Sequence, residues 1–216
     1  MHTKNIRPTF YYIFIIFYSC NVEHADLTEF AEFLKSEKPE FKNSKFIVWG
    51  WSYGGFVASH VAGNQAKIWD CAIAIQPITS ADSFDTIFIE KLMKDKNQNS
   101  DGYEKSVAMS GLDKKQEYFT KFSVIMGTGD NAHHFSNAAL MEKKIVNAGF
   151  EFNNYFISNG QSVREHYIQH RVMHGVMDEV DKVISKKDFE KSGDLISKRA
   201  YSLLFRKIND CVRGEL

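Results

Sequence analysis

The stretch "WGWSYGG", residues 49–55, decides the fold, because it joins two apolar segments through a G-x-S-x-G motif. The apolar run "KFIV" before it predicts a short buried strand, and "YGGFVASHVAG" predicts a helix that ends at Gly63. A serine on a sharp strand-to-helix turn is the arrangement of a nucleophile elbow. We expect Gly50 and Gly54 to be needed there, because side chains at both positions would collide with the neighbouring strand and helix.

Helical and strand patterns alternate along the rest of the chain, which is typical of an α/β domain with a mostly parallel sheet. Further helices are predicted for residues 25–38, where Pro39 stops the helix, and for residues 135–149 and 164–184. Further buried strands are predicted within residues 71–77 and 150–158, and residues 122–130 are predicted as a strand that runs into a glycine-rich turn. The second of these helices is expected to stop at Gly149.

The chain is expected to divide into three parts. Residues 1–20 carry two basic residues before an apolar run, which is the layout of a secretory leader, although a buried strand of the domain fits equally well. Residues 21–185 form the α/β domain, and the charged residues 186–216 form a helical tail. A leader predicts a secreted or membrane-associated extracellular protein. Without a leader, the protein is expected in the cytoplasm.

Composition argues against several kinds of partner. The 27 basic and 27 acidic residues cancel, so no nucleic-acid partner is expected. The three cysteines show no metal-binding spacing, and we expect neither a metal nor a cofactor.

If Cys20 belongs to a removed leader, Cys71 and Cys211 could pair in an oxidising compartment, but two free thiols fit the sequence equally well.

Several segments together resemble the prolyl oligopeptidase family of serine peptidases, in its dipeptidyl peptidase IV branch. The resemblance rests on "WGWSYGGFVAS", "CAIAIQPIT", "FDTIFIEKLM", "GTGDNAHHF" and "ALMEKKIVNAGFEF", which follow in the family's order over about residues 22–184. It implies the C-terminal part of an α/β-hydrolase domain, with a truncated, mostly parallel sheet flanked by helices. It also implies a peptide as substrate and a homodimer as the assembled form.

The resemblance assigns catalytic roles to single positions. Ser52 matches the nucleophile, and Asp130 in "GTGD" matches the acid that orients the catalytic histidine. A turn-forming role for Asp130 is the simpler alternative. The backbone N–H of Tyr53 matches the oxyanion donor that normally follows a nucleophile, and Trp51, which precedes the serine, is assigned to substrate binding.

Phe84 and Phe88 match two tyrosines of the family that wall a small apolar pocket for the penultimate proline or alanine of the substrate. Their rings are present here, whereas the hydroxyl groups are not. The alternative is that the two side chains form one face of a core helix, since they are four residues apart.

The sequence departs from the family where the catalytic histidine is expected. The segment "NGQSVREHYIQH" has Gln161 or Ser162 at that position, depending on the alignment. Neither side chain can take the proton of the serine, because a general base needs a pKa near the working pH. His166 is a candidate to replace the histidine, whereas His24 and His60 are expected to be structural.

The sequence also departs from the family in how much of the family's domains the matching segments cover. Family members carry a β-propeller whose acidic pair holds the free amino end of the substrate, and an early hydrolase loop that gives a second oxyanion donor; the resemblance covers neither.

Two hypotheses about the function follow. The first is a serine peptidase that releases dipeptides with proline or alanine in second position, by acylation of Ser52. The second is a catalytically dead or truncated hydrolase-like protein that acts, if at all, as an interaction module.

Overall fold

The computed structural model describes residues 23–64, 66–112, 120–128, 135–150, 152–157 and 195–215. Its elements are, in chain order, α1 (Glu23–Glu37), η1 (Pro39–Phe41), β1 (Ile47–Trp51), α2 (Tyr53–Asn64), β2 (Cys71–Ile75), η2 (Ala81–Ser83), α3 (Thr86–Met93), α4 (Ser100–Lys105), β3 (Lys121–Gly127), α5 (Ser136–Asn147), β4 (Asn153–Ile157) and α9 (Leu195–Arg213). The predicted α/β class is confirmed. The helix predicted at residues 164–184 lies outside the described residues.

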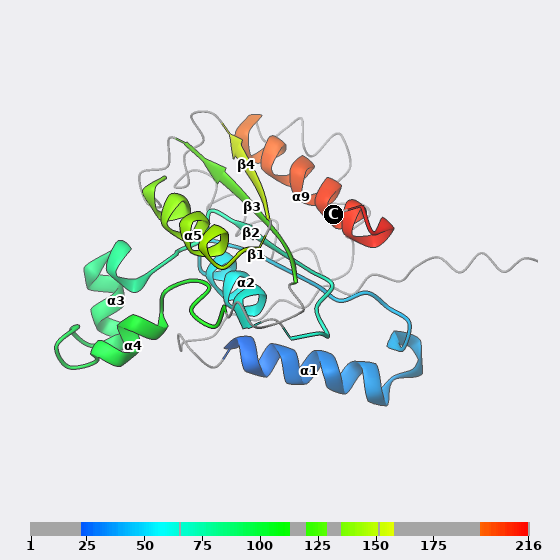
Figure 1. Ribbon diagram of the computed structural model, residues 1–216, viewed down its shortest axis with the longest axis horizontal. Helices are drawn as coiled ribbons and strands as arrows, with labels where there is room; N and C mark the ends of the chain where they lie inside the picture. Colours follow the sequence, from blue (N-terminus) through cyan, green and yellow to red (C-terminus); the bar gives the residue numbers. More distant parts are fainter. Residues whose placement is uncertain are drawn as a thin grey trace, which may run out of the picture.

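A parallel sheet of four strands forms the centre of the described structure, in the order β1-β2-β3-β4 (Figure 1). Trp51 at the end of β1 lies opposite Ile75 of β2, which in turn lies opposite Ile125 of β3. The carboxyl ends of three neighbouring strands therefore meet at one edge of the sheet. Binding sites in open parallel α/β sheets form outside this edge.

Different helices cover the two faces of the sheet (Figure 1). Ala72 and Ala74 of β2 belong to the core that includes residues of α1, α2 and α5, whereas Ile73 and Ile75 belong to the core shared with α9. Successive side chains of a strand point to opposite faces, so β2 is buried on both sides. The small alanine side chains let α2 approach the sheet closely.

Helix α9 covers the face opposite to α2 (Figure 1). Its buried side chains recur at helical spacing, at Ala200, Leu204, Ile208 and Cys211. Cys211 forms a disulfide with Cys71, the first residue of β2, and their Cα atoms are 6.3 Å apart. The pairing that the sequence left open is therefore formed.

Two lysines hold the carboxyl end of α9 at the amino ends of the strands. Lys45 Nζ donates to the carbonyl of Cys211 at 3.1 Å, and Lys121 Nζ donates to that of Gly214 at 3.4 Å. Positive charge is favourable at this end of a helix, because the last carbonyl groups carry the negative end of the helix dipole. Most of the segment expected as a charged tail thus packs on the sheet. The boundary expected before it lies outside the described residues.

The two glycines expected to end helices, Gly63 and Gly149, have different roles in the structure. Helix α2 continues to Asn64, so the expectation that it ends at Gly63 is wrong. A Cβ atom at Gly63 would lie 2.7 Å from the Cα atom of Met109, and glycine is needed there for close packing. Gly149, by contrast, follows α5 with a φ of 81°, the left-handed conformation expected where a helix stops.

Candidate active site

Ser52 occupies the turn between β1 and α2, at the carboxyl edge of the sheet. Its φ is 55°, in the left-handed region that residues other than glycine rarely adopt. Its N–H donates to the carbonyl of Ile75 at 2.9 Å, and its carbonyl accepts from the N–H of Phe56 at 3.0 Å. The first bond ties the turn to β2, and the second begins α2. Ser52 thus has the strained strand-to-helix geometry of a nucleophile elbow.

The glycines around Ser52 act differently from the sequence-based expectation. A Cβ atom at Gly50 would overlap the backbone of Gly54, so the absence of a side chain at Gly50 is required as predicted. At Gly54 a Cβ atom would meet nothing within 4 Å, and the expected collision there is wrong. The second tight position is Gly55, where a Cβ atom would lie 2.9 Å from the carbonyl oxygen of Ile75. Gly50 and Gly55 therefore let the elbow close onto β1 and β2.

Tyr53 is the first residue of α2. The N–H groups of the first helical turn point to the amino end, where the helix dipole favours a negative charge such as an oxyanion. The side chain points to α1, because its hydroxyl donates to Glu23 Oε1 at 2.7 Å and its ring stacks on Phe56 at 5.6 Å between centroids. Glu23 is a partner that sequence reasoning missed.

Trp51, the other neighbour of Ser52, is buried in the core beneath α9. Its ring lies 5.6 Å from that of Tyr201, between centroids. Its indole Nε1 is buried and makes no hydrogen bond within the described part of the chain. The structure therefore places Trp51 between the elbow and α9.

Phe84 is half-buried and contacts both the main core and a smaller cluster formed by Ala81, Ile89, Met93 and Tyr103. It has an extended backbone, with a φ of −117°, and precedes α3, which begins at Thr86. The alternative that Phe84 and Phe88 share one helix face is therefore wrong. Phe88 lies within α3, but its side chain is outside the described part.

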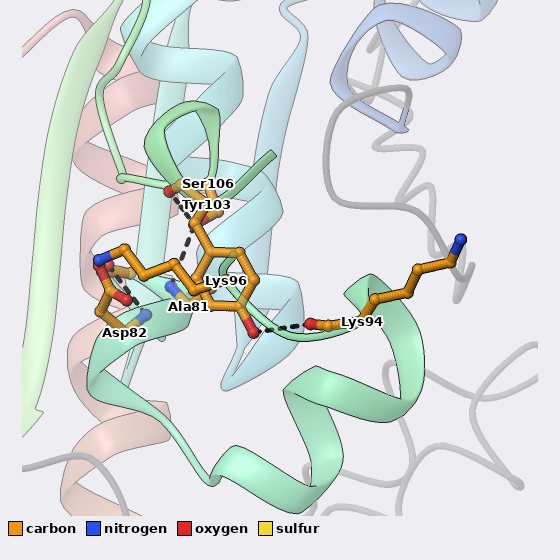
Figure 2. Close-up of polar contacts among 7 residues, drawn as sticks. Ala81, Asp82, Lys94, Lys96, Tyr103 and Ser106 are labelled. Carbon is orange, nitrogen blue, oxygen red and sulfur yellow. Dashed lines mark hydrogen bonds and ion pairs between the residues drawn. The ribbon is translucent and has the colours of Figure 1, made fainter. Parts of the chain in front are cut away.

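A polar network holds the segment that carries Phe84 (Figure 2). The buried Ser106 hydroxyl accepts from the N–H of Ala81 at 3.1 Å and donates to the carbonyl of Tyr103 at 2.7 Å. The Tyr103 hydroxyl in turn donates to the carbonyl of Lys94 at 2.9 Å. This network joins the residues before α3 to those after α4, so it fixes the base of the α3–α4 unit.

Four of the predicted site positions lie outside the described residues: Asp130, Gln161, Ser162 and His166. Their predicted roles stay predictions. Towards Asp130, the structure describes β3 and the following Thr128.

His60 is structural, as predicted. It is buried in α2, 4.3 Å from Phe56 and 6.1 Å from His24 between ring centroids. Burial lowers its pKa from 6.5 to about 4, with further lowering by the nearby His24 and Lys144, while a backbone hydrogen bond with Ser106 opposes the shift. Burial also lowers the pKa of His24. The stacked His24 and His60 rings therefore form part of the packing between α1 and α2.

The described ranges contain no group of three or more histidine, cysteine or carboxylate side chains arranged to hold a metal ion. No helix in them is long and apolar enough to cross a membrane.

Gln76 was missed by sequence reasoning. It directly follows β2, is buried, and has a φ of 45°. Its Oε1 accepts from the N–H of Gly127 at 3.0 Å. A polar residue at the end of the apolar run "CAIAI" is the signal that could have found it.

A parallel α/β sheet with a serine on a positive-φ turn between a strand and a helix is the arrangement of the α/β-hydrolase class of proteins. Residues 19–183 match the model of the prolyl oligopeptidase family, and the chain belongs to this family.

Curated relatives and a solved structure agree with this assignment. Dipeptidyl peptidase 4 of Bos taurus is 32% identical over 112 residues, covering 51% of this chain and 14% of the relative. Prolyl endopeptidase FAP of Mus musculus is 33% identical over 134 residues, covering 57% and 17%. The crystal structure of Porphyromonas gingivalis dipeptidyl peptidase 4 superposes with a TM-score of 0.57 at 19% identity, over 72% of this chain and 23% of that one. The predicted α/β-hydrolase fold is thereby confirmed, and the chain spans a small part of its relatives' length.

Proposed function

We propose that this chain is a serine peptidase of the dipeptidyl peptidase type, with its nucleophile at Ser52 and with strongly impaired turnover. The observation that carries the proposal is the positive φ of Ser52 between β1 and α2. Such strain persists only where the surrounding structure imposes it, and it is typical of active sites. Here the hydrogen bonds of Ser52 to Ile75 and Phe56 impose it.

The chemistry would proceed through an acyl-enzyme. Ser52 Oγ attacks the peptide carbonyl, an ester forms as the amine leaves, and water then hydrolyses the ester. The N–H of Tyr53 would stabilise the oxyanion, and Asp130 would orient the base. The base is the weak point, because Gln161 or Ser162 stands at the histidine position. Loss of such a histidine lowers turnover by about 10⁶, or about 8 kcal/mol of barrier.

The proposed substrates are peptides with proline or alanine second from the amino end. Two relatives are named dipeptidyl peptidase 4 and prolyl endopeptidase FAP, which supports a small apolar pocket for such residues. Phe84 and Phe88 would wall this pocket. The network of Ser106 and Ala81 would hold the segment that carries it.

A second candidate function is a non-catalytic, hydrolase-like interaction protein. The lack of a histidine at positions 161 and 162 favours it, since an elbow without a general base loses most of its catalytic rate. Retention of Ser52 favours the first candidate, because a protein without catalysis has no chemical need for this serine.

A labelling experiment separates the two candidates. The purified chain is treated with a fluorophosphonate probe beside a Ser52→Ala control, and a glycyl-prolyl chromogenic substrate is assayed in parallel. Labelling that depends on Ser52, with slow turnover, supports the impaired peptidase. No labelling and no turnover in a folded chain supports the interaction protein. A His166→Ala variant is included, and loss of labelling and turnover in the folded His166→Ala variant would identify His166 as the replacement base.

We also propose that the protein works in an oxidising, extracellular setting, either secreted or associated with a membrane. The disulfide between Cys71 and Cys211 supports this, because such bonds are rare where the cytosol keeps thiols reduced.

A homodimer is the proposed assembly. Sedimentation of the purified chain over a range of concentrations would test it.

A further inference from the structure

Gln76 lies between the nucleophile elbow and the end of β3. The residue before it, Ile75, accepts the N–H of Ser52, and Ile78 donates to the carbonyl of Ser52 at 3.4 Å. On the other side, the N–H of Gln76 donates to the carbonyl of Ile125 at 2.9 Å. The segment around Gln76 is therefore bonded to β1 and β3 at the same time.

The side chain of Gln76 extends this connection. Strand β2 ends at Ile75, and the backbone of Gln76, with a φ of 45°, leaves the extended conformation of a strand. Gln76 Oε1 instead accepts from the N–H of Gly127, the last residue of β3, at 3.0 Å. A side-chain amide thus takes the place of main-chain pairing at the carboxyl edge of the sheet.

Two features indicate that this contact does more than fill the core. The backbone of Gln76 is held at a φ of 45°, which costs free energy in any residue other than glycine, and the side chain is only 2% exposed. Ser52 and Gln76 thus adopt left-handed conformations at the ends of adjacent strands. An apolar side chain at position 76 would leave the buried N–H of Gly127 without this acceptor.

We propose that Gln76 is a positioning residue, which fixes the end of β3 relative to the elbow of Ser52. The proposal rests on the proposed function in so far as Asp130, which follows β3 in the sequence, is the catalytic acid. Gln76 acts through Gly127 and not on the substrate. The contact itself lies wholly among described residues, so it can be tested whether or not the protein turns over a substrate.

The test uses three variants of the full chain. Gln76→Met removes the acceptor at similar size, Gln76→Gly removes it while fitting the left-handed backbone, and Gln76→Glu keeps an acceptor oxygen. Thr120→Val is the matched control, because Thr120 is buried just before β3, at the opposite edge of the sheet, and its hydroxyl makes no hydrogen bond in the described structure. Gln76→Gly keeps the test valid if Gln76→Met fails to fold.

Two readouts are compared. Amide hydrogen exchange of Gly127, measured by NMR against Ile73 of β2 as the internal reference, should become about tenfold faster in Gln76→Met and Gln76→Gly and should recover in Gln76→Glu. Fluorophosphonate labelling of Ser52 should slow by about tenfold in the first two variants and by less than about twofold in Thr120→Val.

The outcomes separate this inference from the proposed function. Unchanged exchange at Gly127 in both acceptor-free variants would overturn the inference. Faster exchange with an unchanged labelling rate would overturn it as well, because the contact would then be structural only. If the unmodified chain is not labelled at all, the proposed function fails. In that case the amide chemical shift of Ser52 replaces the labelling rate: a shift in Gln76→Gly but not in Thr120→Val supports the inference, and no shift overturns it.

Discussion

Cys71, at the start of β2, is bonded through a disulfide to Cys211, two residues before the end of α9. The two residues are 140 positions apart in the chain. The disulfide therefore connects strand β2 of the central sheet to helix α9, which covers one face of that sheet. Lys45 reinforces the same place by donating to the carbonyl of Cys211.

Removal of the disulfide should destabilise the protein. A long closed loop restricts the unfolded chain, so Cys71→Ala with Cys211→Ala is expected to lower the free energy of unfolding by about 3 kcal/mol. Urea unfolding with and without reductant measures this, and the double variant should not respond to reductant. Thiol titration of the denatured, unreduced chain is expected to find Cys20 alone. Detection of all three cysteines as thiols would contradict the prediction.

The two glycines of the G-x-S-x-G motif should respond oppositely to alanine. Gly50→Ala forces a Cβ atom into the backbone of Gly54 and should cost about 3 kcal/mol or prevent folding. Gly54→Ala places a Cβ atom in open space in the first turn of α2, and should be neutral or stabilise by up to about 1 kcal/mol. Thermal unfolding of both variants makes the comparison. Equal losses of stability would show that the close approach at Gly50 is not decisive.

His60 should make the fold sensitive to acid. Its pKa is about 4 in the folded protein against 6.5 ordinarily, so the unfolded chain binds a proton first as the pH falls. The contribution of His60 to stability is complete above about pH 6.5, declines between there and about pH 4, and amounts to about 3 kcal/mol. The His60→Leu variant loses this dependence.

Urea unfolding of both proteins, from about pH 7.5 to about pH 4.5, tests the prediction. The stability difference between them isolates His60, because the carboxylates titrate in both. The neighbouring His24 and Lys144 are kept in both proteins. A difference that does not change with pH would refute the shifted pKa.

Ser106→Ala should loosen the base of the α3–α4 unit. The substitution leaves the buried N–H of Ala81 without its acceptor and should cost about 2 kcal/mol. Lys96→Ala is the matched control, because the exposed ion pair of Lys96 with Asp82, at 2.7 Å, is worth about 0–1 kcal/mol (Figure 2).

Proteolysis of the segment between β2 and β3 gives a second measurement for these two variants. Faster cleavage is expected in Ser106→Ala only. If both variants behave alike, the hydroxyl of Ser106 does not hold the unit.

The sequence by itself determined the central strands, helix α2 and the elbow. The continuous apolar run "CAIAI", which is buried along its whole length, and the glycines around Ser52 are local signals, because a short buried strand and a steric turn depend on residues close in the chain. The family resemblance was carried by the same short segments. These signals predicted β1, α2 and the position of the nucleophile.

Only the tertiary structure decided the long-range relationships. The pairing of Cys71 with Cys211 depends on how α9 docks against β2, and the bond from Gly127 to Gln76 joins residues 51 positions apart. The need for glycine at position 63 comes from Met109 in a distant loop. Such contacts arise when separate elements pack together, and no local periodicity in the sequence records which elements will meet.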